Sequence, residues 1–256
     1  MKSQSVIYEQ RGEVGIIYLN EPDKMNALSM ALKKQLLTVL QRIHQQAINV
    51  LIITGNGKGF CAGGDLTAMQ ESYDAMAIKE SMELSTQIVQ QLRALPQITI
   101  SVVNGFAAGA GFSLALSTDL TIAEKQAKFI IAFKSVGLIP DLGLHYYLQK
   151  ALGSRLAKEW IFQGKIIPAL EAQSYQFVNE VVPKDEGLEH ALKLAEELLA
   201  GPIEAFKASK RILNELEDEQ VKQVMEKENL VQVILRGEKE HEGCLQQFLQ
   251  NKVVKT

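Results

Sequence analysis

Short apolar runs alternate with segments of helical periodicity along the first half of the chain. Ser29 is suited to cap a helix in which apolar residues recur every three or four positions. A longer helical pattern with a possible break extends from residue 66 to about residue 92. Strands are predicted where short, β-branched runs are bounded by polar or glycine residues, at 14–19, 50–54, 98–103, 120–123 and 129–133. This alternation predicts right-handed βαβ units and therefore an α/β fold.

The strand signal fades after about residue 142, where only residues 177–182 still have the strand pattern. Helical patterns follow at residues 188–199, 202–216 and 221–235. We therefore predict an α/β core over residues 1–195 and a C-terminal helical region over residues 196–256. The apolar stripes of that region need a partner surface, which points to oligomerisation.

Composition excludes several functional classes. The chain has 256 residues and a net charge of −3, so its overall charge favours neither nucleic acid nor an anionic membrane. Lys207, Lys210 and Arg211 are too few to indicate RNA binding. No apolar run approaches the length of a membrane span. Cys61 and Cys244 lie far apart and form no metal-ligand or disulfide pattern, so we expect a cytoplasmic protein without a metal site.

Two glycine-rich loops each lie between a predicted strand and a predicted helix. They cover residues 57–66 and 104–111 and contain mostly small side chains. Backbone N–H groups at a helix N-terminus are unpaired and carry a positive partial charge. Glycines of this kind also occur simply to make tight turns. Because α/β folds place ligands at the carboxyl ends of strands, both loops together indicate a pair of N–H donors facing one developing oxyanion.

Two other interpretations of the second loop are weaker. Residues 109–111 resemble the start of a dinucleotide-binding fingerprint, but Leu114 stands where the third small residue belongs. Residues 111–115 approximate a nucleophile elbow, yet Ser113 comes long after the strand instead of directly following it. The remaining members of such a triad would come from Asp141 and one of three histidines, His145, His190 and His241. We expect Ser113 to be a helix residue beside the site.

Five segments in the correct order resemble the crotonase (enoyl-CoA hydratase/isomerase) superfamily along nearly the whole chain. They are residues 21–28 (EPDKMNAL), 60–66 (FCAGGDL), 104–120, 129–143 and 171–183. The resemblance implies a spiral of βαβ units with a C-terminal helical trimerisation region, as a homotrimer or a hexamer made of two trimers. It implies an acyl-CoA thioester as substrate and no permanently bound cofactor. Lys210 and the helix near Phe248 would contact a neighbouring subunit and the coenzyme.

The resemblance also assigns site residues by position. The oxyanion donors would be the backbone N–H groups of Gly64 and Ala110. The carbonyls around Ala62 would meet the adenine, Lys24 would lie near the coenzyme phosphates, and Asp65 would hold its own loop in shape. The remaining residues expected to bind substrate are Ala27, Gly63, Leu66, Ser113 and Phe133.

The chain departs from the hydratase pattern at the two catalytic glutamates. Ser113 and Phe133 stand at those positions, and neither can activate water or protonate carbon. One acid remains in the corresponding segment, Asp141, where the ring-epoxide isomerase of phenylacetate catabolism also has a carboxylate. Asp141 could instead cap the following helix, and His145 could tune it or simply pack. We predict an enoyl-CoA isomerase with Asp141 as its acid–base residue; the alternatives are a hydratase with an atypical site and a non-catalytic acyl-CoA-binding scaffold.

Overall fold

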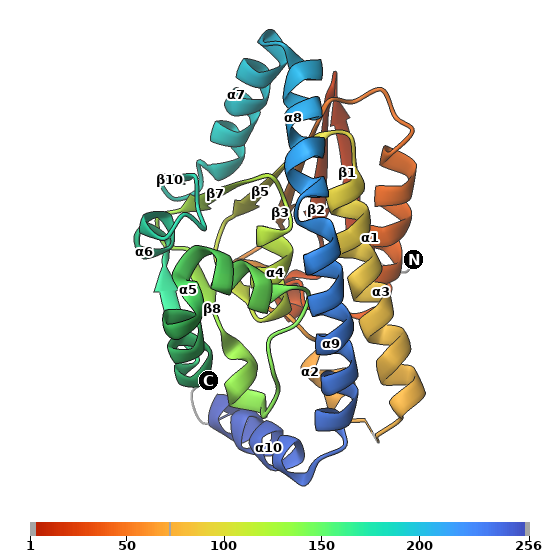
Figure 1. Ribbon diagram of the computed structural model, residues 1–256, viewed down its shortest axis with the longest axis vertical. Coiled ribbons are helices and arrows are strands. Elements are labelled where there is room, and N and C mark those ends of the chain that lie inside the picture. Colours follow the sequence, from red (N-terminus) through yellow and green to blue (C-terminus); the bar gives the residue numbers. More distant parts are fainter. Residues whose placement is uncertain (1–3, 72, 254–256) are drawn as a thin grey trace.

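A six-stranded sheet forms the centre of the computed structural model, which describes residues 4–71 and 73–253 (Figure 1). Strands follow the order β1-β2-β3-β5-β7-β10. β1 and β2 form an antiparallel hairpin, and the other strands are parallel. Their bounds are β1 Val6–Arg11, β2 Val14–Leu19, β3 Val50–Gly55, β5 Ile98–Val103, β7 Leu120–Glu124 and β10 Glu180–Val182. The α/β fold predicted from the apolar runs is confirmed.

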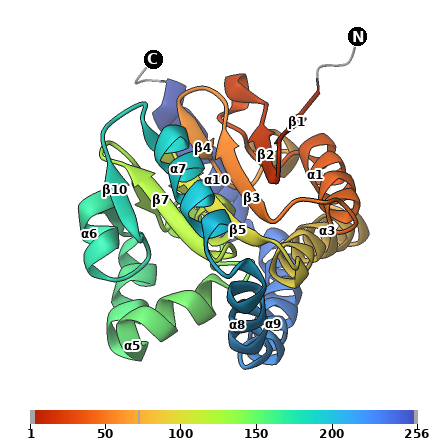
Figure 2. The same ribbon diagram turned by 90° about the horizontal axis from the view of Figure 1, so that it is seen from above.

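Helices cover both faces of this sheet because its parallel strands are apolar on both sides. One face packs against α1 (Met30–Ile43), α3 (Ala75–Ala94) and α4 (Ala110–Leu116). The other face packs against α7 (Gly187–Ala200), through Ala191 and Ala195. Figure 2 shows α1 and α3 side by side along one flank of the sheet. Ser29 caps α1 by accepting a hydrogen bond from Leu32 N, as its position predicts.

A smaller sheet lies next to the large one and carries the site loops. It has the order β4-β6-β8-β9, with bounds β4 Gly59–Cys61, β6 Phe106–Ala108, β8 Lys128–Ile130 and β9 Ile166–Pro168. β4, β6 and β8 are parallel and directly follow β3, β5 and β7 in the chain. Each turn of the chain therefore contributes one strand to each sheet, which is the spiral that the family resemblance implies.

Several element boundaries differ from the sequence predictions. The strand predicted at 129–133 is wrong beyond Ile130, where the 3-10 helix η2 (Ala132–Val136) begins. The strand signal at 177–182 yields only the three residues of β10. The helical pattern at 66–92 is broken, as expected, into α2 (Leu66–Met69) and α3. Asp65 and Asp74 are the N-caps of these two helices, so each helix has its own start.

The C-terminal half is helical and packs back on the same chain. Besides α7, its helices are α5 (Leu144–Gln163), α6 (Ala169–Ser174), α8 (Ile203–Glu215), α9 (Asp218–Arg236) and α10 (Lys239–Val253). α9 packs against α3 and α5, and α10 lies against η2 (Figure 1). Among the residues placed by the structure, no helix combines the length and apolarity needed to cross a membrane.

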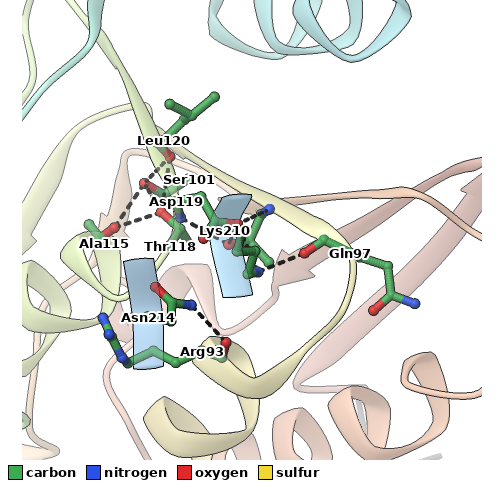
Figure 3. Close-up of polar contacts among 10 residues, drawn as sticks. Arg93, Gln97, Ser101, Ala115, Thr118, Asp119, Leu120, Lys210 and Asn214 are labelled. Carbon is green, nitrogen blue, oxygen red and sulfur yellow. Dashed lines mark hydrogen bonds and ion pairs between the residues drawn. The ribbon is translucent and has the colours of Figure 1, made fainter. Parts of the chain in front are cut away.

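An ion pair ties α8 to the large sheet (Figure 3). The Lys210 ammonium lies 2.8 Å from Oδ2 of Asp119 and donates to the Gln97 carbonyl at 2.7 Å. One turn later, the Asn214 amide donates to the Arg93 carbonyl at 3.0 Å. The sequence resemblance places Lys210 toward a neighbouring subunit and the coenzyme, whereas the structure shows its charge satisfied inside its own chain.

Candidate active site

The two glycine-rich loops leave adjacent parallel strands, β4 and β6, and touch each other. Gly63 has a φ of +89°, and a Cβ built on it would lie 2.5 Å from the Ala108 carbonyl oxygen and 3.2 Å from Ala110 N. A Cβ on Gly111 would lie 2.2 Å from the Cys61 carbonyl oxygen. Side chains at either position would push the loops apart, so the glycines are needed for this close approach.

Two backbone N–H groups are available where these loops meet. Ala110 is the first residue of α4 and therefore has no acceptor within the helix. Within the described ranges, the N–H groups of Gly64 and Ala110 both lack a backbone acceptor. Both residues line one cavity of about 580 Å³. Two unpaired donors on adjoining loops are the arrangement that an oxyanion hole requires.

The same cavity collects most of the residues predicted to bind substrate. The predicted substrate-binding residues found on the cavity wall are Lys24, Ala27, Ala62, Asp65, Leu66 and Phe133. Asp65 accepts a hydrogen bond from Thr67 N at 2.9 Å and pairs with the Lys24 ammonium at 3.3 Å. Asp65 therefore supports its own loop, in agreement with the role expected for it. Gly63 and Ser113 lie behind the cavity wall instead of on it.

Asp141 is the buried acid of the cavity. It is 8% exposed, and its Oδ2 accepts a hydrogen bond from the Gln232 amide at 3.3 Å. Oδ1 has no hydrogen-bond partner among the described residues. The pKa of Asp141 is raised to about 7, mainly by burial and also by the negative charge of Glu228, while the Gln232 hydrogen bond and the Lys33 charge oppose the shift. A carboxyl group with this pKa exchanges protons readily near neutral pH.

The backbone around Asp141 is held from two sides. The Ser113 hydroxyl donates to the Asp141 carbonyl at 2.8 Å. The Glu228 carboxylate accepts from Gly143 N at 2.7 Å and contacts Nδ1 of His145 at 2.7 Å. Helix α5 begins at Leu144 with Gly143 as its N-cap, so the alternative that Asp141 caps this helix is wrong. His145 pairs with Glu228 and not with Asp141.

The residues at the two family positions for glutamate, Ser113 and Phe133, have structural contacts. Phe133 packs beside the second loop, with its ring 3.6 Å from the place of a Cβ on Gly109. Ser113 is fully buried in α4, as predicted, and its hydroxyl is engaged with Asp141. The nucleophile-elbow interpretation fails because no described histidine contacts Ser113: the candidate triad histidines pair with Glu228, with Glu180 and Glu186, or with the Val136 carbonyl.

Sequence reasoning missed the contribution of α9 to the site. Gln232 and Arg236 of this helix line the cavity, and Glu228 lies behind it. One signal was available: Glu228 and Gln232 fall on the buried stripe of α9, in register with the apolar Val221 and Met225. Polar residues on such a stripe need specific partners, and here these are the Asp141 segment and its neighbours.

No group of three metal-ligating side chains occurs within residues 4–71 and 73–253. Cys61, beside the first loop, is fully buried, and burial raises the pKa of its thiol to about 12. A protonated, enclosed thiol is a poor nucleophile. The chemistry available to the cavity is therefore proton transfer by Asp141 next to a pair of backbone N–H donors.

Known proteins resemble this chain in sequence and in fold. The family model described as Enoyl-CoA hydratase/isomerase matches residues 9–254. The chain is 34% identical to YhaR of Bacillus subtilis, described as an enoyl-CoA hydratase/isomerase, over 96% of both chains. It is 33% identical to the 1,2-epoxyphenylacetyl-CoA isomerase of Escherichia coli over 78% of both chains. The crystal structure of an enoyl-CoA hydratase from Bacillus halodurans superposes with a TM-score of 0.87 at 26% identity, covering 95% of this chain and 99% of that one.

Proposed function

The chain belongs to the enoyl-CoA hydratase/isomerase family, of the crotonase superfamily, and we propose that it is an enoyl-CoA isomerase with Asp141 as its acid–base residue. One observation carries the proposal. The unpartnered Oδ1 of Asp141 belongs to a side chain that lines the same cavity as the N–H donors of Gly64 and Ala110. The carboxyl group of Asp141 thus shares the cavity in which an enolate oxygen would be held.

The reaction proceeds as two proton transfers through one enolate. The Asp141 carboxylate removes a proton from C2 of a 3-enoyl thioester, and the electron pair moves onto the thioester oxygen. The N–H groups of Gly64 and Ala110 stabilise that oxygen, and one donor of this kind contributes roughly 3–4 kcal/mol to the transition state. Protonated Asp141 then returns the proton to C4, which leaves the double bond between C2 and C3. A pKa near 7 suits both steps.

Hydration makes demands that this cavity does not meet. It needs a positioned water and normally a second carboxylate, and the two family positions for glutamate hold Ser113 and Phe133. Glu228 is buried and committed to Gly143 N and His145.

We also propose that residues 196–256 are an oligomerisation region and that the protein is a homotrimer or a dimer of trimers. The support is the set of large apolar side chains left exposed on α8, at its C-cap and on α9, which are Phe206, Ile212, Leu213, Leu216, Leu230, Val231 and Ile234. Apolar exposure of this extent is typical of a surface that pairs with another copy. A stable monomer in sedimentation experiments at micromolar concentration would contradict this assembly.

The function is tested by replacing Asp141 with Asn, which keeps the shape and removes the base. Conversion of a 3-enoyl-CoA to its 2-enoyl isomer should fall by at least about 100-fold, while binding of the CoA ester is largely retained. Asp185→Asn, at an exposed position with a left-handed backbone that Asn tolerates, is the matched control. Rapid hydration of a 2-enoyl-CoA by the wild type, undiminished in Asp141→Asn, would show that both residue and reaction are wrong. Binding without turnover would favour the scaffold alternative.

A further inference from the structure

Arg236, in the last turn of α9, lines the active-site cavity without a partner for its charge. The side chain is half-buried, and burial lowers the pKa of its guanidinium. No carboxylate or carbonyl in the described part of the chain accepts a hydrogen bond from it. The other cation on the cavity wall, Lys24, is paired with Asp65. A partly buried guanidinium costs free energy unless an anion completes its surroundings.

The position of Arg236 relates it to the reacting end of the substrate. Gln232 and Arg236 are four residues apart on α9, so they lie on one face, separated by about 6 Å along the helix axis. The Gln232 amide contacts Oδ2 of Asp141. Arg236 therefore lies about one helical turn beyond the group that would exchange protons with the acyl chain.

The cavity wall also carries apolar side chains, and a second cation lies close to Arg236. Met69, Met82 and Leu138 line the cavity together with Arg236. Lys33 is buried close by: burial lowers its pKa most, the charges of Asp141 and Asp65 oppose this, and the charge of Arg236 lowers it further. An apolar passage with a guanidinium on its wall fits a chain of methylene groups that carries an acid.

We propose that Arg236 is a specificity-determining residue that binds a second carboxylate, carried by the acyl chain of the thioester. The substrate class is then ω-carboxyacyl-CoA, with the thioester oxygen at Gly64 and Ala110 and the distal carboxylate at Arg236. The planar guanidinium can bind such a carboxylate through two parallel hydrogen bonds. This inference rests on the proposed placement of the thioester in the cavity but not on the reaction that follows.

Binding measurements with unreactive ligands test the inference separately from turnover. Calorimetry compares a saturated ω-carboxyacyl-CoA, the uncharged acyl-CoA of equal length, and free coenzyme A. Arg236→Met should weaken binding of the carboxylated ester at least about 10-fold, the loss expected for a hydrogen-bonded charge pair. The affinities for the uncharged ester and for free coenzyme A should not change. Arg236→Lys should retain part of the preference for the carboxylated ester. Arg155→Met, on the exposed side of α5, is the matched control for loss of an arginine.

Two outcomes would overturn the inference. An equal loss for all three ligands, free coenzyme A included, would place a coenzyme phosphate and not an acyl carboxylate at Arg236. An unchanged affinity for the carboxylated ester in a folded Arg236→Met protein would show that the guanidinium binds no anion. If Asp141→Asn retains full isomerase activity while the carboxylate preference depends on Arg236, the proposed reaction fails and the specificity assignment stands.

Discussion

Asp119 and Asp141 both lie beside helix α4, but their surroundings differ. Oδ2 of Asp119 accepts from Thr99 N at 2.7 Å and from the Thr99 hydroxyl at 2.8 Å, and it pairs with Lys210 at 2.8 Å (Figure 3). Asp141 has one longer hydrogen bond, at 3.3 Å, and a free oxygen. Three donors of the fold thus hold one oxygen of Asp119, whereas Asp141 keeps its capacity for a ligand or a proton.

The cations near the two carboxylates, Lys210 and Arg236, also differ in their number of partners. Lys210 is satisfied by Asp119 and the Gln97 carbonyl, and Arg236 has no acidic partner in the described ranges. Buried polar groups in folded proteins normally have hydrogen-bond partners, so the exceptions call for a functional explanation. We call Thr99, Asp119 and Lys210 the anchoring cluster. The number of hydrogen-bond and ion-pair partners, rather than burial alone, distinguishes this cluster from the active-site cavity.

The largest effect is expected from breaking the anchoring cluster. Asp119→Asn leaves the Lys210 ammonium, whose side chain is 7% exposed, without its counter-charge. Removing one partner of such a buried pair costs about 3–5 kcal/mol of unfolding free energy. Chemical denaturation measures this loss, with Asp185→Asn as the control at an exposed aspartate. Unchanged stability would mean that the ion pair does not hold α8 to the sheet.

Asp141→Asn should have the opposite effect on stability at alkaline pH. The folded pKa of Asp141, about 7, exceeds its ordinary value of 3.8, so the folded state binds more protons between these values. The contribution of Asp141 to the unfolding free energy of the wild type therefore falls as pH rises from about 4 to 7, by about 4 kcal/mol in total. The Asn variant lacks this loss, and it should be more stable than wild type at pH 8 and similar below pH 4. Denaturation curves of both proteins at pH 4 and pH 8 measure this difference. A variant less stable than wild type at pH 8 would contradict the conclusion that the Asp141 carboxylate lacks stabilising partners.

The oxyanion donors give an activity effect of at least about 100-fold, equivalent to roughly 3 kcal/mol. Ala110→Pro removes one N–H at the first position of α4, where proline suits a helix. Ala75→Pro is the matched control because Ala75 begins α3 outside the cavity, and its cap, Asp74, bonds to Met76 N and Ala77 N instead. Turnover assays on both folded variants should show the loss only for Ala110→Pro. Normal activity in that variant would remove Ala110 from the site.

Much of the fold follows from local sequence signals. Buried parallel strands are continuous β-branched runs, so Val14–Leu19 and Ile98–Val103 are predicted with their exact bounds. Only β8 of the small sheet was predicted, within residues 129–133; β4, β6 and β9 escaped prediction because strands of three residues are too short for any period to show. The glycine-rich loops were recognisable because close approach of two backbones restricts side chains at positions such as Gly63 and Gly111.

The candidate site was harder to predict where it depends on contacts between distant segments. Asp141 was identifiable as the acid in the right segment, but its unpaired Oδ1 depends on burial that only the folded chain creates. Gln232 and Arg236 come from a helix assigned, from the sequence, to assembly alone. Helical periodicity shows which face of α9 is buried, and it does not show what that face meets.

The smallest expected effect is on the pH profile of turnover, which tests whether the pKa of Asp141 controls the reaction. Because Asp141 must begin as a carboxylate, kcat/KM should fall about tenfold per pH unit below pH 7. The Gln232 hydrogen bond lowers the pKa of Asp141, so Gln232→Leu should raise that pKa and move the acidic limb to higher pH. Gln223→Leu, at an exposed glutamine of the same helix, should leave the limb in place. A merely structural role for Gln232 would lower activity at every pH without moving the limb, and that result would separate the amide from the proton transfer.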